Sequence, residues 1–172
     1  PCVPHSCRIM SYQKTAEVAG CSVHAVAVLC KSNSGATHYD PELNRYLILY
    51  NGSMNPGRVR WTLGHEIGHI CIGHLETMEV AEIAYTEQRE FYDQLESEAD
   101  YFAWNLLAPL PILREMGIRS VDELKTVCGL STQAAALQYD RYVKWCRSHI
   151  KTAWESDMLR AFRAKNVARR VQ

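Results

Sequence analysis

The sequence predicts an α+β fold, in which a small, mainly antiparallel sheet packs against helices. Before residue 52, short runs rich in β-branched and aromatic residues alternate with turn residues. After residue 56, apolar residues recur at helical spacing. A chain of 172 residues with 47% hydrophobic residues supplies a core for one domain with a helical appendage. We place the main domain at residues 1–115 and a helical C-terminal region at 116–172.

The first fifty residues predict one helix followed by strands. A helix is expected over 9–20, where apolar residues recur at helical spacing and Gly20 supplies an end. The run 23–30 contains three valines and predicts a strand, although its alanines leave a helix open. Two more strands are expected on either side of a turn at Asp40-Pro41, over residues 36–39 and 45–50.

The segment 58–74, RVRWTLGHEIGHICIGH, contains the pattern H-E-x-x-H. On a helix, His65 and His69 lie one turn apart on one face, about 6 Å along the axis, so that both imidazoles can bind one Zn²⁺. Glu66 projects beside them, where a carboxylate can accept a proton from water. Gly68 weakens an isolated helix, and we expect it to let another backbone pack closely beside the histidines.

A second segment, ESEADYFAWNLLAP at 96–109, can supply the third metal ligand that the first segment lacks. A catalytic zinc is held by three protein ligands, and Glu96 can be the third. Asp100 lies four residues on, on the same helix face, where it can accept the free ring N–H of a ligand histidine. Glu98 is the alternative third ligand. It lies roughly 200° around the helix from Glu96, so the two cannot face one metal.

HEIGH followed by ExEADYFAWNLLAP resembles the ImmA/IrrE family of zinc metallopeptidases over roughly residues 40–115. The resemblance implies a zincin-like fold with a gluzincin-like metal site. It places the zinc ligands at His65, His69 and Glu96, and the catalytic base at Glu66. It also implies a substrate class, because members of the family typically cleave helix-turn-helix repressor proteins and so release genes of mobile elements or stress responses.

Two nearby residues are weaker ligand candidates. The metzincin pattern requires Gly at position 72 and His at position 75, where this chain has Ile72 and Leu75. His74 is therefore interpreted as a helix-end histidine near the negative end of the helix dipole. Cys71 is expected to be a small buried apolar residue rather than a ligand.

The amino-acid composition limits the kinds of binding partner and the cellular compartment that we expect for the protein. Charge is balanced at 19 basic and 19 acidic residues, so no net field attracts nucleic acid or an anionic membrane. No run of 18 apolar residues is present, which argues against a membrane span. Seven cysteines without a secretion signal indicate reduced thiols and a cytoplasmic location.

The C-terminal region is predicted to be helical, and we find no further candidate catalytic or metal-binding residues in it. Ser120 and Ser131 are predicted N-caps of two helices joined at Gly129, an arrangement that resembles a helix-turn-helix. Few basic residues lie on the second helix, which argues against DNA contact. The basic tail 147–172 is expected to be a helix docked by an apolar stripe formed by Trp154, Met158, Leu159 and Phe162.

The sequence thus predicts a cytoplasmic zinc endopeptidase that acts on a protein substrate, and the family resemblance implies that this substrate is a helix-turn-helix repressor. Strand 46–50, just before the metal helix, is the candidate edge for binding substrate backbone. The alternative is a zinc-stabilised regulator that binds a repressor or DNA without cutting it. No residue can be assigned from the sequence as a second oxyanion donor.

Overall fold

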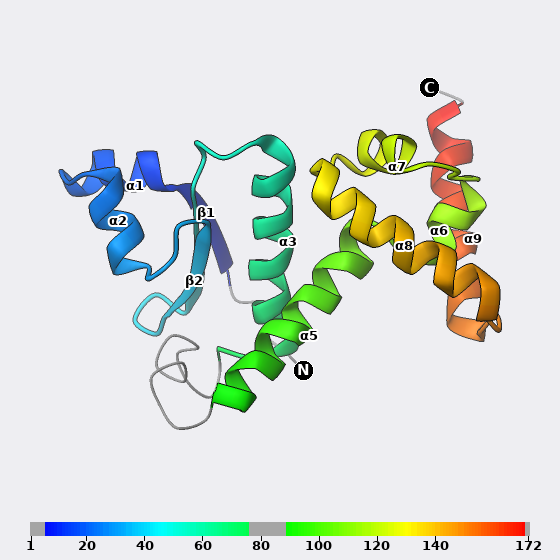
Figure 1. Cartoon of the computed structure of the whole chain (residues 1–172). Coiled ribbons are helices and arrows are strands. Elements are labelled where there is room, and N and C mark those ends of the chain that lie inside the picture. Colours follow the sequence, from blue (N-terminus) through cyan, green and yellow to red (C-terminus); the bar gives the residue numbers. More distant parts are fainter. Residues whose placement is uncertain (1–5, 76–88, 171–172) are drawn as a thin grey trace. The chain divides into compact units, whose positions relative to one another are not determined.

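The computed structural model describes residues 6–75 and 89–170, and Figure 1 shows the arrangement of their helices and strands. Contacts divide the chain into two compact units, residues 1–104 and 105–172. The predicted boundary between a main domain and a helical C-terminal region at residue 115 stays a prediction. Within the described residues the fold is α+β, with a three-stranded sheet. The finer zincin-like architecture also stays a prediction.

The sheet belongs to the first unit and has the strand order β1-β3-β2. Strand β3 (Arg45–Tyr50) is central; it pairs parallel with β1 (Ser6–Ser11) and antiparallel with β2 (Gly35–Asp40). The predicted strands near 36–39 and 45–50 are confirmed. One strand pair is parallel and the other is antiparallel, so the prediction of a mainly antiparallel sheet was wrong. The cause is β1, a strand that occupies the start of the predicted helix 9–20.

Helices cover the sheet on both faces (Figure 1). Helices α1 (Tyr12–Ala19) and α2 (Val23–Leu29) form a core with Leu49 of β3, and Leu47 packs beside it. Because side chains alternate along a strand, the fully buried Ile48 faces the opposite side, where α3 contacts β2 and β3.

The strand predicted over 23–30 is wrong, because these residues form helix α2. Ser22 caps the helix by accepting a hydrogen bond from the backbone N–H of Ala25 at 3.1 Å. Val26 then turns into the core against α1 while its neighbours are more exposed. The β-branched valines favoured a strand, but the cap and one buried face decide the conformation.

Helix α3 (Pro56–Ile72) carries the H-E-x-x-H pattern and begins at an Asn55 cap. It packs tightly on β2. A Cβ added at Gly35 would lie 2.4 Å from Cγ2 of Thr62 and 3.0 Å from the carbonyl oxygen of Leu49. Only glycine fits between α3 and the central strand at this point, so β2 runs directly beside the helix that carries the H-E-x-x-H pattern.

Helix α5 (Arg89–Leu107) carries the second motif. Its Trp104 packs against Trp61 of α3, with ring centroids 4.2 Å apart. The predicted connector 75–95 lies mostly outside the described residues, but its last part, from Arg89, is helical.

The second unit consists of helices, with bounds α6 (Leu110–Glu115), α7 (Val121–Cys128), α8 (Thr132–Ser148) and α9 (Ala153–Arg170). The predicted caps are confirmed: Ser120 accepts from the N–H of Glu123 at 3.1 Å and Ser131 from that of Ala134 at 3.2 Å. In α9, Trp154 is 64% exposed, so the predicted apolar stripe loses its first member.

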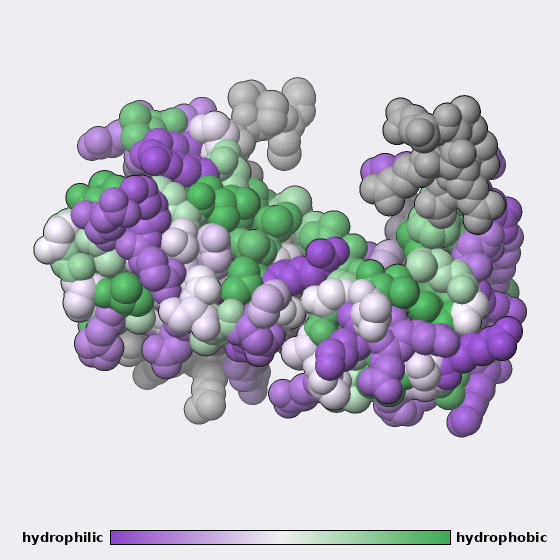
Figure 2. All heavy atoms as spheres, turned by 90° about the horizontal axis from the view of Figure 1, so that it is seen from above, coloured by the Kyte–Doolittle hydropathy of each residue, from purple (hydrophilic) through white to green (hydrophobic). Residues whose placement is uncertain are grey.

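Among the described residues, no helix is both long and apolar enough to cross a membrane. Apolar and hydrophilic residues are interspersed over the face shown in Figure 2.

Candidate metal centre

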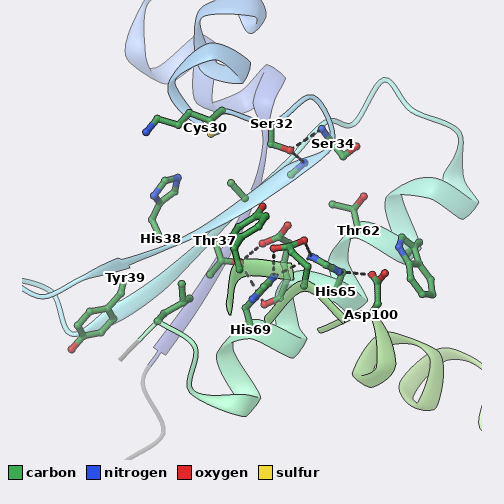
Figure 3. Close-up of a pocket in the computed structure, with 18 of the residues that line it drawn as sticks. Cys30, Ser32, Ser34, Thr37, His38, Tyr39, Thr62, His65, His69 and Asp100 are labelled. Carbon is green, nitrogen blue, oxygen red and sulfur yellow. Dashed lines mark hydrogen bonds and ion pairs between the residues drawn. The ribbon is translucent and has the colours of Figure 1, made fainter. Parts of the chain in front are cut away.

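His65 and His69 point toward one another from one face of α3 (Figure 3). Their Nε2 atoms are 3.0 Å apart, and their rings meet nearly edge to face, with an interplanar angle of 76°. His69 is only 4% exposed. The helical spacing that the sequence predicted therefore brings two ring nitrogens to one point.

Glu96 of α5 reaches the same point. Its Oε2 lies 3.3 Å from Nε2 of His65, and its Oε1 lies 3.4 Å from Nε2 of His69. Four tetrahedral ligands about 2.0–2.1 Å from a zinc ion are separated from each other by about 3.3 Å. Glu96 thus presents one oxygen to each ring nitrogen at about this separation, and the three residues together could hold one metal ion.

Asp100 accounts for the other nitrogen of His65. Its Oδ1 accepts a hydrogen bond from Nδ1–H of His65 at 2.8 Å, the contact predicted from the four-residue spacing to Glu96. This contact holds a proton on Nδ1, so that Nε2 is the nitrogen that faces the donor cluster and can bind a metal ion in place of its own proton.

The charges around these donors favour a cation. Burial disfavours the charged form of His65, but hydrogen bonds to Asp100 and Glu96 outweigh burial and raise its pKa to about 10. Burial also opposes ionisation of Glu96, yet hydrogen bonds from His65 and His69 hold its pKa well below the usual range. A metal ion can replace the proton that these carboxylates stabilise.

Glu98 does not reach the donor cluster. Its Oε2 lies 3.1 Å from Nε2 of His74, whose Nδ1 lies 2.9 Å from Nδ1 of His69. The alternative in which Glu98 replaces Glu96 as a ligand finds no support in this geometry. His74 is 6% exposed, and burial lowers its pKa, so the neutral imidazole is favoured. It is therefore a buried partner of His69 rather than a residue placed only to meet the helix dipole.

Glu66 lies beside the donors and is 7% exposed. Its Oε2 accepts a hydrogen bond from Oγ1 of Thr37 in β2, at 2.7 Å. Burial raises the pKa of Glu66, although the Thr37 hydrogen bond opposes this effect. A carboxylate with a raised pKa, held next to a metal position, has the properties of a general base.

A cavity of about 700 Å³ opens over these residues, and Figure 3 shows β2 along one side of it. The lining includes Gly35–Tyr39 of β2, Trp61 of α3 and Tyr92 of α5. Among the described strands, β2 is therefore the edge strand beside the cavity. Strand β3 is paired on both sides, so the expectation that 46–50 offers an edge was wrong.

Sequence reasoning missed three residues that the fold brings to this site: Thr37, His74 and Tyr92. Tyr92 precedes Glu96 by one helical turn, a spacing that could have identified it. Burial, followed by the charge of Glu96, raises its pKa to about 12. Thr37 carried no local signal, because its position depends on how β2 packs against α3. Cys71, expected to be buried, is exposed.

The fold brings together, from two helices beside a strand of the sheet, three side chains that could hold one metal ion. Residues 21–138 match the family described as the IrrE N-terminal-like domain, a peptidase family, and the chain belongs to it. This finding confirms the predicted membership of the ImmA/IrrE family.

The chain is also similar to the radiation response metalloprotease IrrE of Deinococcus radiodurans, with 37% identity over 79 residues. The matched segment is 45% of this chain and spans 23% of that relative. The family and this relative support a metallopeptidase-type function that uses a metal ion.

Proposed function

We propose that this chain is a zinc-dependent endopeptidase. The observation that carries the proposal is the convergence of Nε2 of His65, Nε2 of His69 and a carboxylate oxygen of Glu96, all within 4.8 Å of one another. Two imidazoles and one carboxylate, with a fourth position open, are the ligand set of hydrolytic zinc sites.

The protein groups supply binding and proton transfer. A zinc ion held there would polarise the scissile carbonyl and make water at the open position more acidic. Glu66 accepts a proton from the attacking water and later delivers it to the leaving amine. Asp100 holds a proton on Nδ1 of His65, so that Nε2 is the nitrogen that can act as a ligand.

The substrate we propose is an extended segment of a protein. Strand β2 lies at the sheet edge and lines the cavity over five consecutive residues, Gly35–Tyr39. A substrate segment can add to this edge through main-chain hydrogen bonds, which places a peptide bond next to Glu66. Substrate peptides with N-methylated backbone amides beside the cleavage site should bind and react poorly if this mode operates.

The proposed target is a helix-turn-helix repressor, whose loss would release mobile-element or stress genes, and the proposed location is the cytoplasm. Family membership and the similarity to a radiation response metalloprotease support the first proposal. The described cysteines, all free thiols, support the second.

The decisive experiment incubates zinc-loaded protein with a repressor encoded beside it and identifies fragments by mass spectrometry. Glu66→Gln removes the base while it retains the size of the side chain, so zinc should still bind and cleavage should fall by about 100- to 10,000-fold. Glu90→Gln, an exposed change on α5, is the matched control and should cleave normally. Zinc binding and repressor binding without fragments would instead favour the non-cleaving regulator.

A further inference from the structure

A line of hydrogen bonds leads from His69 away from the metal position. Nδ1 of His69 lies 2.9 Å from Nδ1 of His74, and Nε2 of His74 lies 3.1 Å from Oε2 of Glu98. Oε1 of Glu98 accepts a further hydrogen bond from the Gln94 amide at 2.8 Å, which fixes the carboxylate. His74 and His69 are buried, so water does not compete for their ring nitrogens.

The carboxylate determines where each proton lies. An ionised Glu98 only accepts hydrogen bonds, so Nε2 of His74 must be the donor. In a neutral His74 ring, Nδ1 is then an acceptor, and it takes its hydrogen bond from Nδ1–H of His69. This arrangement leaves Nε2 of His69 with a lone pair directed at His65 and Glu96.

The opposite tautomer of His69, with its proton on Nε2, would prevent this histidine from binding a metal. If Nε2 of His69 carried the proton, that proton would point toward Nε2 of His65, 3.0 Å away, and Nε2 of His69 could not bind a metal. Nδ1 of His69 would then require a donor from His74, and a neutral His74 would present a bare nitrogen to the carboxylate of Glu98. Two acceptors would then face each other, one of them a buried nitrogen of His74, and the cost of this contact disfavours the state.

We infer that His74 and Glu98 are positioning residues that hold His69 in the tautomer able to bind the metal, a role that rests on the metal centre of the proposed function. Asp100 performs the corresponding task for His65 through a direct hydrogen bond. The two histidines thus depend on different carboxylates of α5, His65 on Asp100 directly and His69 on Glu98 through His74.

Zinc affinity, measured by competition with a chelator, tests the inference without any substrate. His74→Phe removes the acceptor for Nδ1–H of His69 and should weaken zinc binding about 10- to 100-fold. His74→Gln offers a side-chain oxygen at a similar place and should recover most of the affinity. His24→Phe, an exposed change on α2, controls for the loss of an imidazole and should bind zinc normally.

Variants of Glu98 provide a second test by the same measurement of zinc affinity. Glu98→Leu should weaken zinc binding, whereas Glu98→Gln, whose oxygen can still accept from His74, should weaken it less. The absorption spectrum of bound Co²⁺ should shift in His74→Phe, since the ligand geometry at His69 changes, and should be unchanged in Glu90→Gln. Unaltered zinc affinity in folded His74→Phe and Glu98→Leu would overturn the inference.

Nitrogen-15 NMR of the metal-free wild-type protein reads the tautomers directly and needs no substitution. We expect the His69 proton on Nδ1 and the His74 proton on Nε2; a proton on Nε2 of His69 would overturn the inference. These measurements are independent of peptidase activity. A protein in which zinc binding depends on His74 but no repressor is cleaved would sustain the inference and reject the proposed function.

Discussion

Gly68 of α3 lies directly against the backbone of Ala99 in α5. A Cβ added at Gly68 would lie 3.2 Å from Cα of Ala99 and 3.1 Å from its carbonyl oxygen. Neither atom belongs to a flexible side chain, so the two helices touch backbone to backbone. The contact lies one residue before His69 and three after Glu96. The predicted use of Gly68 for close helix packing is confirmed.

Gly68→Ala should therefore separate the helices and weaken the metal centre. Alanine favours a helix by about 1 kcal/mol over glycine, but overpacking costs typically about 1–3 kcal/mol. We expect a lower melting temperature and weaker zinc binding, measured by calorimetry and chelator competition. Gly57→Ala, in the first turn of α3, is the control for helix propensity. A variant at position 68 that gained stability and kept its zinc affinity would contradict this packing.

Thr37→Val tests how β2 tunes the base. The hydroxyl of Thr37 donates to Glu66 and lowers its pKa against the opposing effect of burial, so its loss should raise that pKa further. Glu66 is active only when ionised, and the acidic limb of the pH profile of kcat should therefore move to higher pH. Activity near pH 6 should fall more than activity near pH 8.

Thr37→Ser keeps the hydroxyl and is the matched control, since its acidic limb should stay at the wild-type position. An unchanged limb in Thr37→Val would mean that Glu66 does not titrate in the limiting step.

The sequence predicted the parts of the centre that depend on one helix at a time. His65 and His69 are related by one turn of α3, and Glu96 and Asp100 by one turn of α5. Such spacing depends only on the geometry of the helix itself and not on contacts with the rest of the chain. The convergence of the two pairs on one point also agrees with the resemblance, which linked the two segments before any contact between them was known.

Other contacts between distant segments were not predicted. The partnership of His74 with Glu98 spans 24 residues and needs the geometry of the α3–α5 packing. Strand β1 has no distinctive alternation and is defined by its parallel pairing with β3. That pairing also covers the second edge of β3, which is why the substrate edge was assigned to the wrong strand.

Tyr92→Phe tests the one pocket tyrosine that lies a turn from a ligand. Its phenol keeps its proton, because burial and the charge of Glu96 raise its pKa to about 12, so it is a hydrogen-bond donor throughout the neutral range. If it donates to the oxyanion that forms during cleavage, its loss should lower kcat by about 100- to 1,000-fold.

Zinc affinity should change much less in Tyr92→Phe than in Glu96→Ala, since only the latter removes a donor atom of the metal centre. Tyr39→Phe, a change at the other tyrosine of the cavity lining, gives the comparison for loss of a phenol. Equal kcat in the wild type and Tyr92→Phe would exclude the oxyanion role.

Zinc binding should release a proton from His65. In the metal-free protein its pKa of about 10 means that the ring is charged at neutral pH, whereas a zinc ligand must be neutral. Zinc and the proton therefore compete, and the apparent affinity should rise about tenfold per pH unit between pH 7 and 9. Calorimetry in buffers of different ionisation enthalpy should detect about one proton released per zinc. Asp100→Asn removes one carboxylate that holds this proton, so its affinity should depend less steeply on pH near 9. An affinity independent of pH in the wild type would show that His65 is already neutral before the metal binds.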